Sequence, residues 1–166
     1  MAQVNQSNLF QFDAGILNKD ACVVIVRTEW NQAIVGELEK GCIRTLEAAG
    51  IHQHPVITVP GAFEIPFAIK RYYETQTGNK APAAFIALGC VLRGDTPHFE
   101  YVCNAVTDGV VQLNLQLPVP VIFGVLTVNT QQQADERIGG IHGHKGEEAA
   151  ITALKMIALN DQLKKA

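Results

Sequence analysis

The sequence predicts an α/β fold in which a four-stranded parallel sheet lies between layers of helices. Short runs of apolar, often β-branched residues recur along the chain, as is typical of strands buried on both faces. Segments with apolar residues at helical spacing lie between these runs, and the connections are short. Strands that alternate with helices in this way indicate a doubly wound sheet.

The first half of the chain contains two predicted strands and two predicted helices. Residues 1–20 show no clear period, and we treat them as an N-terminal arm. Residues 21–27 form the first strand, and apolar residues recur at helical spacing over residues 34–49. Residues 56–59 form the second strand, and Pro-Gly then leads into a helix over residues 63–77.

The second half continues the same alternation. A long apolar run at residues 83–92 is the third strand, and a helix follows over residues 99–117. Two prolines precede the fourth strand at residues 121–126. A short helix over residues 131–138 is then separated by glycines from a final amphipathic helix at residues 147–163.

We expect residues 21–166 to form a single domain, a flavodoxin-like three-layer sandwich, because no repeat or linker interrupts the pattern. Right-handed crossovers bring every turn from a strand into a helix to one edge of the sheet. Ligands of open α/β sheets bind at this carboxyl edge. We therefore look for functional residues in those turns.

Composition excludes several classes of function. The chain has 166 residues, 48% of them apolar and 17% charged, and its net charge of −3 includes no basic block that would bind nucleic acid. No apolar run approaches the roughly 18 residues of a membrane span. The four cysteines lack metal-site spacing, and three lie in or beside apolar runs, which favours buried thiols in a reducing cytoplasm. The low charge fraction favours a surface partly covered by partner subunits.

The turn after the third strand has the strongest functional pattern. The apolar run stops at Arg93, Thr96 offers a capping hydroxyl, and Pro97 suits the first position of a helix. His98 then falls in the first turn of that helix. Free backbone N–H groups there favour an anion, and a histidine can move protons near neutral pH. Taken alone, the pattern equally fits an ordinary turn with a surface histidine.

The other turns add candidates that each have a plain alternative. Trp30 offers an indole that can stack on a flat heterocycle, or pack on its own helix. Glu64 can accept hydrogen bonds from sugar hydroxyls, or compensate a helix dipole. Phe123 follows in the fourth strand, and Arg137 can fork onto a phosphate or stay solvated. Lys145 opposes the dipole of the last helix by roughly 0.3–1 kcal/mol, so it is either solvated or placed for an acceptor on a ligand. Together they favour a site for a flat polar ring and an anion.

The chain resembles the lumazine synthase family. Four segments carry the resemblance: VPGAFEIP at 59–66, LGCVLRGDTPHFEYVCN at 88–104, PVIFGVLT at 120–127 and HGHKGEEAA at 142–150. Several long motifs in this order and spacing are highly specific, and the similarity extends over nearly the whole chain.

The resemblance implies the penultimate step of riboflavin biosynthesis. The family condenses 5-amino-6-(D-ribitylamino)uracil with 3,4-dihydroxy-2-butanone 4-phosphate to give 6,7-dimethyl-8-ribityllumazine, and phosphate and water are released. It uses neither a metal nor an organic cofactor. Its members are cytoplasmic transferases whose partners are these two small molecules and further copies of the same chain.

The resemblance also implies residue roles. His98 transfers protons. The pyrimidine ring is bordered by Trp30, which stacks on it, and by Asn31, Val91 and Leu92. The ribityl chain is bound by Ala62, Phe63 and Glu64. The phosphate turn contains Asp95 and Thr96. The neighbouring subunit contributes Phe123, Arg137 and Lys145, with Arg137 on the phosphate and Lys145 on the pyrimidine. Asp95 is unexpected there, because it brings a carboxylate close to a phosphate.

We expect a homopentamer at least, with each active site shared between neighbours. Whether rings stay single, pair or close into an icosahedral shell of sixty subunits is left open, and the shell is the leading expectation because residues 138–144 carry no insertion. Two alternatives on the same fold are a non-catalytic flavin-binding or storage protein and a purely structural shell protein.

Overall fold

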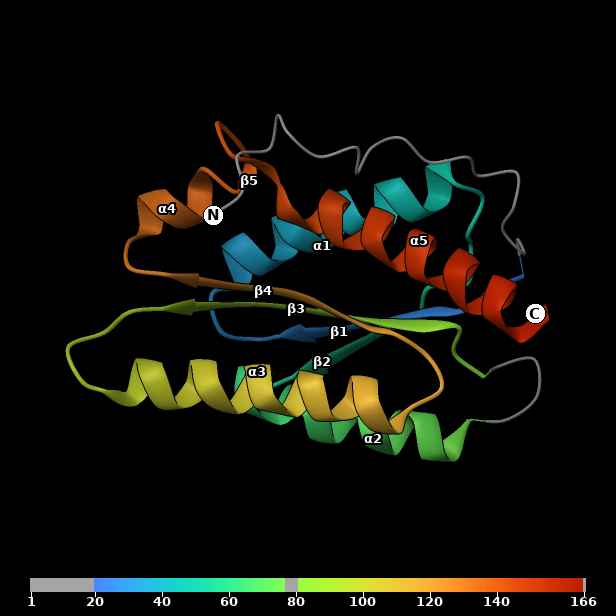
Figure 1. Cartoon of the computed structure of the whole chain (residues 1–166). Helices are drawn as coiled ribbons and strands as arrows, with labels where there is room; N and C mark the ends of the chain where they lie inside the picture. Colours follow the sequence, from blue (N-terminus) through green and yellow to red (C-terminus); the bar gives the residue numbers. More distant parts are fainter. Residues whose placement is uncertain (1–19, 77–80, 166) are drawn as a thin grey trace.

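Four parallel strands form the centre of the structure, in the order β2-β1-β3-β4 across the sheet (Figure 1). The computed structural model describes residues 20–76 and 81–165. The strands are β1 (Val23–Thr28), β2 (Val56–Val59), β3 (Ala84–Leu92) and β4 (Val121–Val128). The predicted four-stranded parallel sheet is confirmed, and its strand order is that of a flavodoxin-like fold.

The strand β3 lies between β1 and β4 and has the longest run of consecutive buried residues of the four. Its residues 84–90 are all buried, and it pairs in parallel with β1 through Ile25 and Ile86 and with β4 through Ala87 and Phe123. Apolar and β-branched residues fill these strands because both faces of the sheet are covered. Polar side chains are therefore concentrated in the connections.

Helices cover both faces of the sheet (Figure 1). On one face lie α1 (Gln32–Ala48) and α5 (Lys145–Lys165); on the other lie α2 (Ile65–Thr75), which follows the short 3-10 turn η4 (Ala62–Glu64), and α3 (His98–Gln116). Side chains alternate along a strand, so neighbouring β1 residues enter different cores. Ile25 packs in the core with Leu38 of α1, and Val26 packs in the other core with Ile69 of α2.

The segment from residue 136 to residue 144 departs most from the sequence prediction. The helix predicted through residue 138 ends as α4 (Gln131–Asp135), and β5 (Ile138–Gly140) pairs with β6 (Gly143–His144) in an antiparallel hairpin. Gly139 and Gly143 have φ angles of 115° and 75°, which other residues rarely adopt. The helix prediction for residues 136–138 was wrong because these glycines turn the chain back on itself.

The remaining differences are shifts of element ends. The helix α3 begins at His98, one residue earlier than predicted, and its N-cap is Pro97 instead of Thr96. The strand β4 runs on to Val128, and α5 begins at Lys145, two residues early. The predicted arm of residues 1–20 lies outside the described residues except for its last position. No helix within the described part of the chain has the length and apolar character needed to cross a membrane.

The first turn of α5 lies directly against the backbone of α1. A Cβ atom added at Gly146 would overlap the carbonyl oxygen of Leu38 and lie 2.8 Å from its carbonyl carbon. Only a glycine permits this approach, and backbone cannot move aside as a flexible side chain can. Because Lys145 precedes Gly146, this contact also fixes where the lysine begins the helix.

We predict that Gly146→Ala lowers the free energy of unfolding by about 1–3 kcal/mol, because the methyl group must push α5 away from α1. The matched control is Gly36→Ala in α1, where no described atom lies within 4 Å of the new methyl group. That change should stabilise the protein by about 0.5–1 kcal/mol, since alanine favours helix. Denaturant unfolding measures the free energy of unfolding of both variants. Equal changes in this free energy would show that α5 does not contact α1 closely at Gly146.

Candidate active site

The turns after β1, β2 and β3 meet at the carboxyl edge of the sheet and enclose a cavity of about 540 Å³, which we call the carboxyl-edge pocket. Its wall includes eight of the residues that the sequence singled out, from all three turns: Trp30, Asn31, Ala62, Phe63, Glu64, Val91, Leu92 and His98. The parallel topology therefore brings together residues that are up to 68 positions apart in the sequence.

Aromatic and acidic side chains stand at the open rim of this pocket. The indole of Trp30 is 73% exposed, and Phe63 is 61% exposed. The backbone N–H of Trp30 donates to the carbonyl of Pro60 at 3.4 Å, so the first two turns are joined. Glu64 closes the 3-10 turn with an N–H donated to Gly61 and keeps an exposed carboxylate. The rim thus offers a flat surface and a hydrogen-bond acceptor to a ligand.

The turn that carries His98 has fewer capping hydrogen bonds than the sequence predicts. His98 is exposed as the first residue of α3, and its N–H reaches the hydroxyl of Thr96 at 3.4 Å. Asp95 and Thr96 are exposed in the same turn but are absent from the wall of the pocket. The imidazole can therefore reach a ligand in the pocket, whereas Asp95 and Thr96 do not line it.

Arg93 holds this turn in place, and sequence reasoning missed it. Its guanidinium donates to Asn129 at 2.7 Å, pairs with Glu100 of α3, and lies 4.1 Å from the ring centre of Phe99. The hydrogen bond from Arg93 lowers the pKa of the Glu100 carboxyl. A signal was present in the sequence, because opposite charges at positions 93 and 100 bracket the turn.

The Cys90 thiol in the pocket wall is unreactive near neutral pH. Cys90 is buried, and burial raises its pKa to about 11; burial likewise raises the pKa of Cys42 to about 12. Both remain protonated near neutral pH and are poor nucleophiles. All four cysteines are free and three are buried, as the sequence predicted. The described residues contain no group of three or more His, Cys, Asp or Glu side chains that could hold a metal ion.

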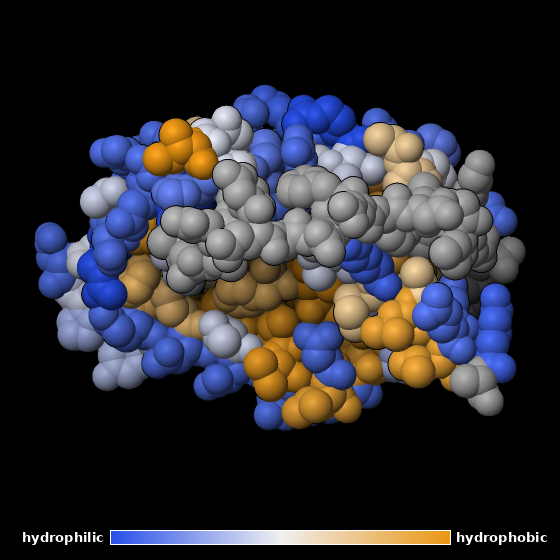
Figure 2. All heavy atoms as spheres, turned by 45° about the horizontal axis from the view of Figure 1, so that its top comes forward, coloured by the Kyte–Doolittle hydropathy of each residue, from blue (hydrophilic) through white to orange (hydrophobic). Residues whose placement is uncertain are grey.

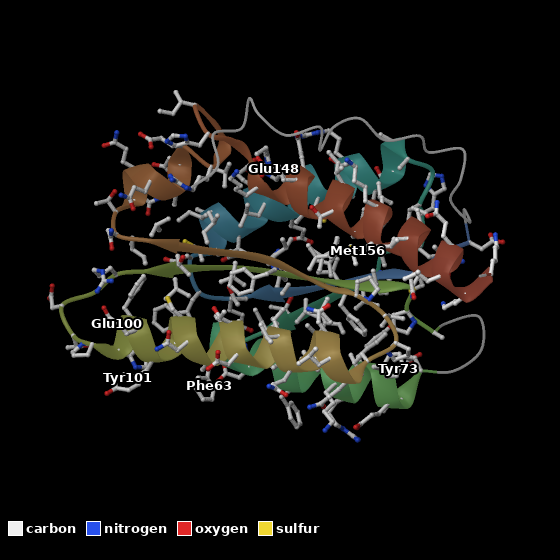
Figure 3. The ribbon with its side chains drawn as sticks, viewed as in Figure 1. Phe63, Tyr73, Glu100, Tyr101, Glu148 and Met156 are labelled. Atoms are coloured by element: carbon white, nitrogen blue, oxygen red, sulfur yellow. The ribbon has the colours of Figure 1, made fainter. Side chains whose placement is uncertain are left out.

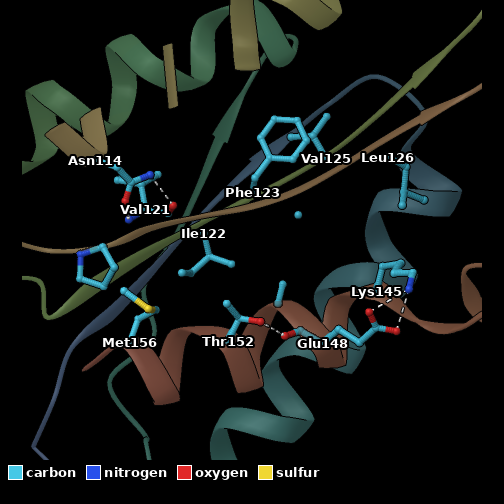
Figure 4. A pocket seen from close by; sticks show the side chains of 13 residues that line it. Asn114, Val121, Ile122, Phe123, Val125, Leu126, Lys145, Glu148, Thr152 and Met156 are labelled. Atoms are coloured by element: carbon cyan, nitrogen blue, oxygen red, sulfur yellow. Dashed lines mark hydrogen bonds and ion pairs between the residues drawn. The ribbon is translucent and has the colours of Figure 1, made fainter. Parts of the chain in front are cut away.

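A second hollow lies along the exposed edge of β4, and we call it the β4 groove (Figure 4). It has a volume of about 470 Å³, and its wall includes Phe123 and Lys145. Both carboxylate oxygens of Glu148 lie 2.8 Å from the ammonium of Lys145, which orients the lysine along the groove. Glu148 was not predicted, although its spacing of three residues from Lys145 on a helix is a signal for such a pair.

The surface around the β4 groove is largely apolar. Figure 2 shows apolar side chains gathered over this side of the molecule, where Figure 1 places β4 between α3 and α5. Phe123 is 41% exposed and Met156 of α5 is 38% exposed. Figure 3 shows Met156 and Glu148 on α5 on one side of the sheet and Phe63 on the other. The groove and the carboxyl-edge pocket share no lining residue.

Arg137 differs from the exposed cation that the sequence suggested. It is only 7% exposed, and its guanidinium donates to the carbonyl of Gln133 at 2.7 Å. Its backbone carbonyl accepts a hydrogen bond from the backbone N–H of Lys145 at 2.8 Å, so the hairpin joins the backbones of these two residues. Arg137 lies in the wall of neither hollow. One chain therefore places ten of the predicted residues in two separate hollows and leaves Asp95, Thr96 and Arg137 outside both.

Known proteins similar to this chain agree on one identity. A family model described as 6,7-dimethyl-8-ribityllumazine synthase matches residues 20–161. A protein of that name from Parabacteroides distasonis is 50% identical over 135 residues, covering 80% of this chain and 82% of the relative. One from Porphyromonas gingivalis is 47% identical over 152 residues, covering 90% and 92%. One from Flavobacterium johnsoniae is 41% identical over 166 residues, covering 98% and 85%.

We predict that Arg93→Ala speeds amide hydrogen exchange in residues 94–100 by roughly 3- to 10-fold, because the turn loses its contacts to Asn129, Glu100 and Phe99 while solvent already screens part of them. Exchange in α5 should not change. Arg71→Ala is the matched control, since it removes one exposed pair with Glu74 inside α2. Unchanged exchange in residues 94–100 would show that Arg93 does not hold the turn.

Proposed function

The chain belongs to the 6,7-dimethyl-8-ribityllumazine synthase family, and from this premise we propose how its residues share the work of the reaction. The enzyme is a transferase of riboflavin biosynthesis that joins 5-amino-6-(D-ribitylamino)uracil to 3,4-dihydroxy-2-butanone 4-phosphate. The relatives are named as synthases, and the non-catalytic alternative gains no support from them.

The reaction requires positioning and proton transfer. An amine attacks a ketone, water is lost, phosphate leaves, and a second amine closes the ring on a carbonyl. A proton moves at each of these stages, and an imidazole can donate and accept it near neutral pH. We assign this role to His98, which is exposed in the wall of the carboxyl-edge pocket. Most of the remaining acceleration should come from holding two substrates in one orientation.

The carboxyl-edge pocket fits the ribitylaminouracil substrate. The exposed indole of Trp30 offers a stacking face for the pyrimidine, and the backbone of Val91 and Leu92 borders the ring from β3. The ribityl chain would follow the turn after β2, along Ala62 and Phe63, where the Glu64 carboxylate accepts hydrogen bonds from its hydroxyls. The single observation that carries this proposal is that these residues, from three separate turns, line one cavity together with His98.

The phosphate-bearing substrate would lie on the outer side of the same pocket. Asp95 and Thr96 occupy the turn before α3, where backbone N–H groups at a helix N-terminus favour an anion. The Asp95 carboxylate is exposed, so it can point to solvent and away from the phosphate. We assign Arg137 of the neighbouring chain to the phosphate as well, with its guanidinium oriented by the Gln133 carbonyl of its own chain.

We also propose that each active site is shared between two neighbouring chains. Within one chain the carboxyl-edge pocket and the β4 groove have no lining residue in common, although the family assigns Phe123 and Lys145 to the same site as Trp30 and His98. If the β4 groove of one chain meets the pocket of the next, the two halves form one site. A heterologous contact of this kind generates a ring when its rotation closes, and we propose a homopentamer, with an icosahedral shell of sixty subunits as its higher assembly.

The enzyme would act in the cytoplasm. Three of its four thiols are buried between the layers, and none forms a disulfide. Such thiols suit a compartment that keeps cysteine reduced.

We predict that His98→Ala lowers the turnover rate at saturating substrate by roughly 10- to 10³-fold, because proton transfer is lost while both substrates still bind. The side chain is exposed, so the melting temperature should stay close to that of the wild type. His52→Ala, at an exposed histidine that does not line the pocket, is the control and should not alter the rate. An unchanged rate in His98→Ala would remove His98 from the mechanism.

A further inference from the structure

Asn31 has a backbone conformation unlike that of any other residue in the pocket wall. Its φ of 58° and ψ of 44° lie in the left-handed region, and among residues 20–76 and 81–165 it is the only residue other than glycine with a positive φ. Asparagine tolerates this region better than most residues. The conformation occurs where the chain leaves β1 and enters α1, directly after Trp30. It therefore sets the direction in which the chain, and the indole before it, leaves the sheet.

The side chain of Asn31 makes a contact that α1 itself does not need. Although Asn31 is the N-cap of α1, its side chain caps no N–H of the helix. Its Nδ2 donates instead to the carbonyl oxygen of Cys90 on β3, at 2.8 Å. The pairing between β1 and β3 ends at Arg27 and Leu88, so Cys90 lies beyond the last paired residue. The carboxamide thus supplies the donor that β1 no longer provides.

This hydrogen bond joins two walls of the carboxyl-edge pocket. One wall carries the indole of Trp30, and the other is the β3 backbone from Cys90 to Leu92. Backbone groups alternate in direction along a strand, so the N–H and C=O of Leu92 face the same side as the carbonyl of Cys90. The hydroxyl of Thr28 also donates to the carbonyl of Trp30 at 3.3 Å, which holds the connection from the strand side. The distance between the indole and the β3 backbone is set at Asn31.

We propose that Asn31 is a positioning residue of the pyrimidine subsite, whose left-handed backbone and hydrogen bond to Cys90 hold the Trp30 indole at a fixed distance from the β3 backbone. A flat heterocycle then has a slot of constant width between a stacking face and a hydrogen-bonding edge. The inference rests on the proposed stacking of Trp30 on the pyrimidine. Asn31 makes its side-chain hydrogen bond to β3 and its backbone hydrogen bonds to α1, away from the turn at residues 93–98, so its effect falls on one substrate.

Three replacements separate the contributions of the backbone and of the amide. Asn31→Gly keeps the positive φ and removes the donor, whereas Asn31→Ala removes the donor and opposes the left-handed backbone. Asn31→Asp keeps the size of the side chain, but an ionised carboxylate cannot donate to Cys90. We expect the KM for the ribitylaminouracil to rise about 3- to 10-fold in Asn31→Gly and further in the other two, with the KM for the ketose phosphate changed less than about twofold.

Two readouts distinguish positioning from a general loss of structure. Trp30 is the only tryptophan of the chain, so its fluorescence can be titrated with the ribitylaminouracil alone. The apparent Kd from this titration should follow the same order as the KM values. In Asn31→Asp, acidic pH protonates the carboxyl and restores a donor. Its affinity relative to the wild type at the same pH should therefore improve as the pH falls, while that of Asn31→Ala should not.

The result that overturns the inference is a wild-type Kd for the ribitylaminouracil in both Asn31→Gly and Asn31→Asp. Equal rises in KM for both substrates, together with a lowered melting temperature, would also overturn it and indicate a structural role. A wild-type protein that binds the ribitylaminouracil but turns over neither substrate would refute the roles proposed for His98 and the shared site, while the fluorescence titration would still decide on Asn31. A Trp30→Ala variant with unchanged ribitylaminouracil KM would refute the stacking and with it this inference.

Discussion

The parallel sheet is buried on both faces, and the position of every functional residue depends on this. Residues 84–90 of β3 are buried, and the two cores on either side contain apolar side chains almost throughout. Chemistry is thereby excluded from the body of the sheet and confined to its margins. One margin is the carboxyl edge, where three turns enclose a pocket; the other is the side of β4, which no further strand of the described chain covers.

The sequence predicted the elements with strong periodicity and failed where tertiary contacts decide. The four strands and the helices α1, α2, α3 and α5 are encoded by runs of β-branched residues and by helical spacing, which are local signals. The β5–β6 hairpin was missed because glycines with positive φ look in sequence like a simple interruption. Arg137 was interpreted from sequence as a phosphate ligand or a solvated helix charge, and its burial depends on the fold of that hairpin. The strand order and the pairing of Asn31 with Cys90 involve contacts between distant segments, which periodicity does not contain.

Ten of the predicted site residues form two groups on one chain, and a contact between subunits would explain why. The pocket holds an exposed indole, a carboxylate and a histidine; the groove holds an aromatic ring and a lysine held by Glu148. Each group alone offers part of what two substrates require. Low charge and the apolar surface along β4 suit a large contact between copies of the chain. The family resemblance supplied the candidate residues, and the fold separates most of them into these two groups.

The claim that the two groups complete each other across a subunit contact can be tested directly by mixing two variants of strongly reduced activity. His98→Ala disables the pocket and Lys145→Ala disables the groove; the two chains are unfolded, refolded together in equal amounts, and checked for mixed assemblies by native mass spectrometry. If sites are shared, about a quarter of them combine an intact pocket with an intact groove, and lumazine formation returns to that extent. If each site lies within one chain, every site contains one of the two substitutions and no activity returns. Verified mixed assemblies with no recovered activity would contradict the account.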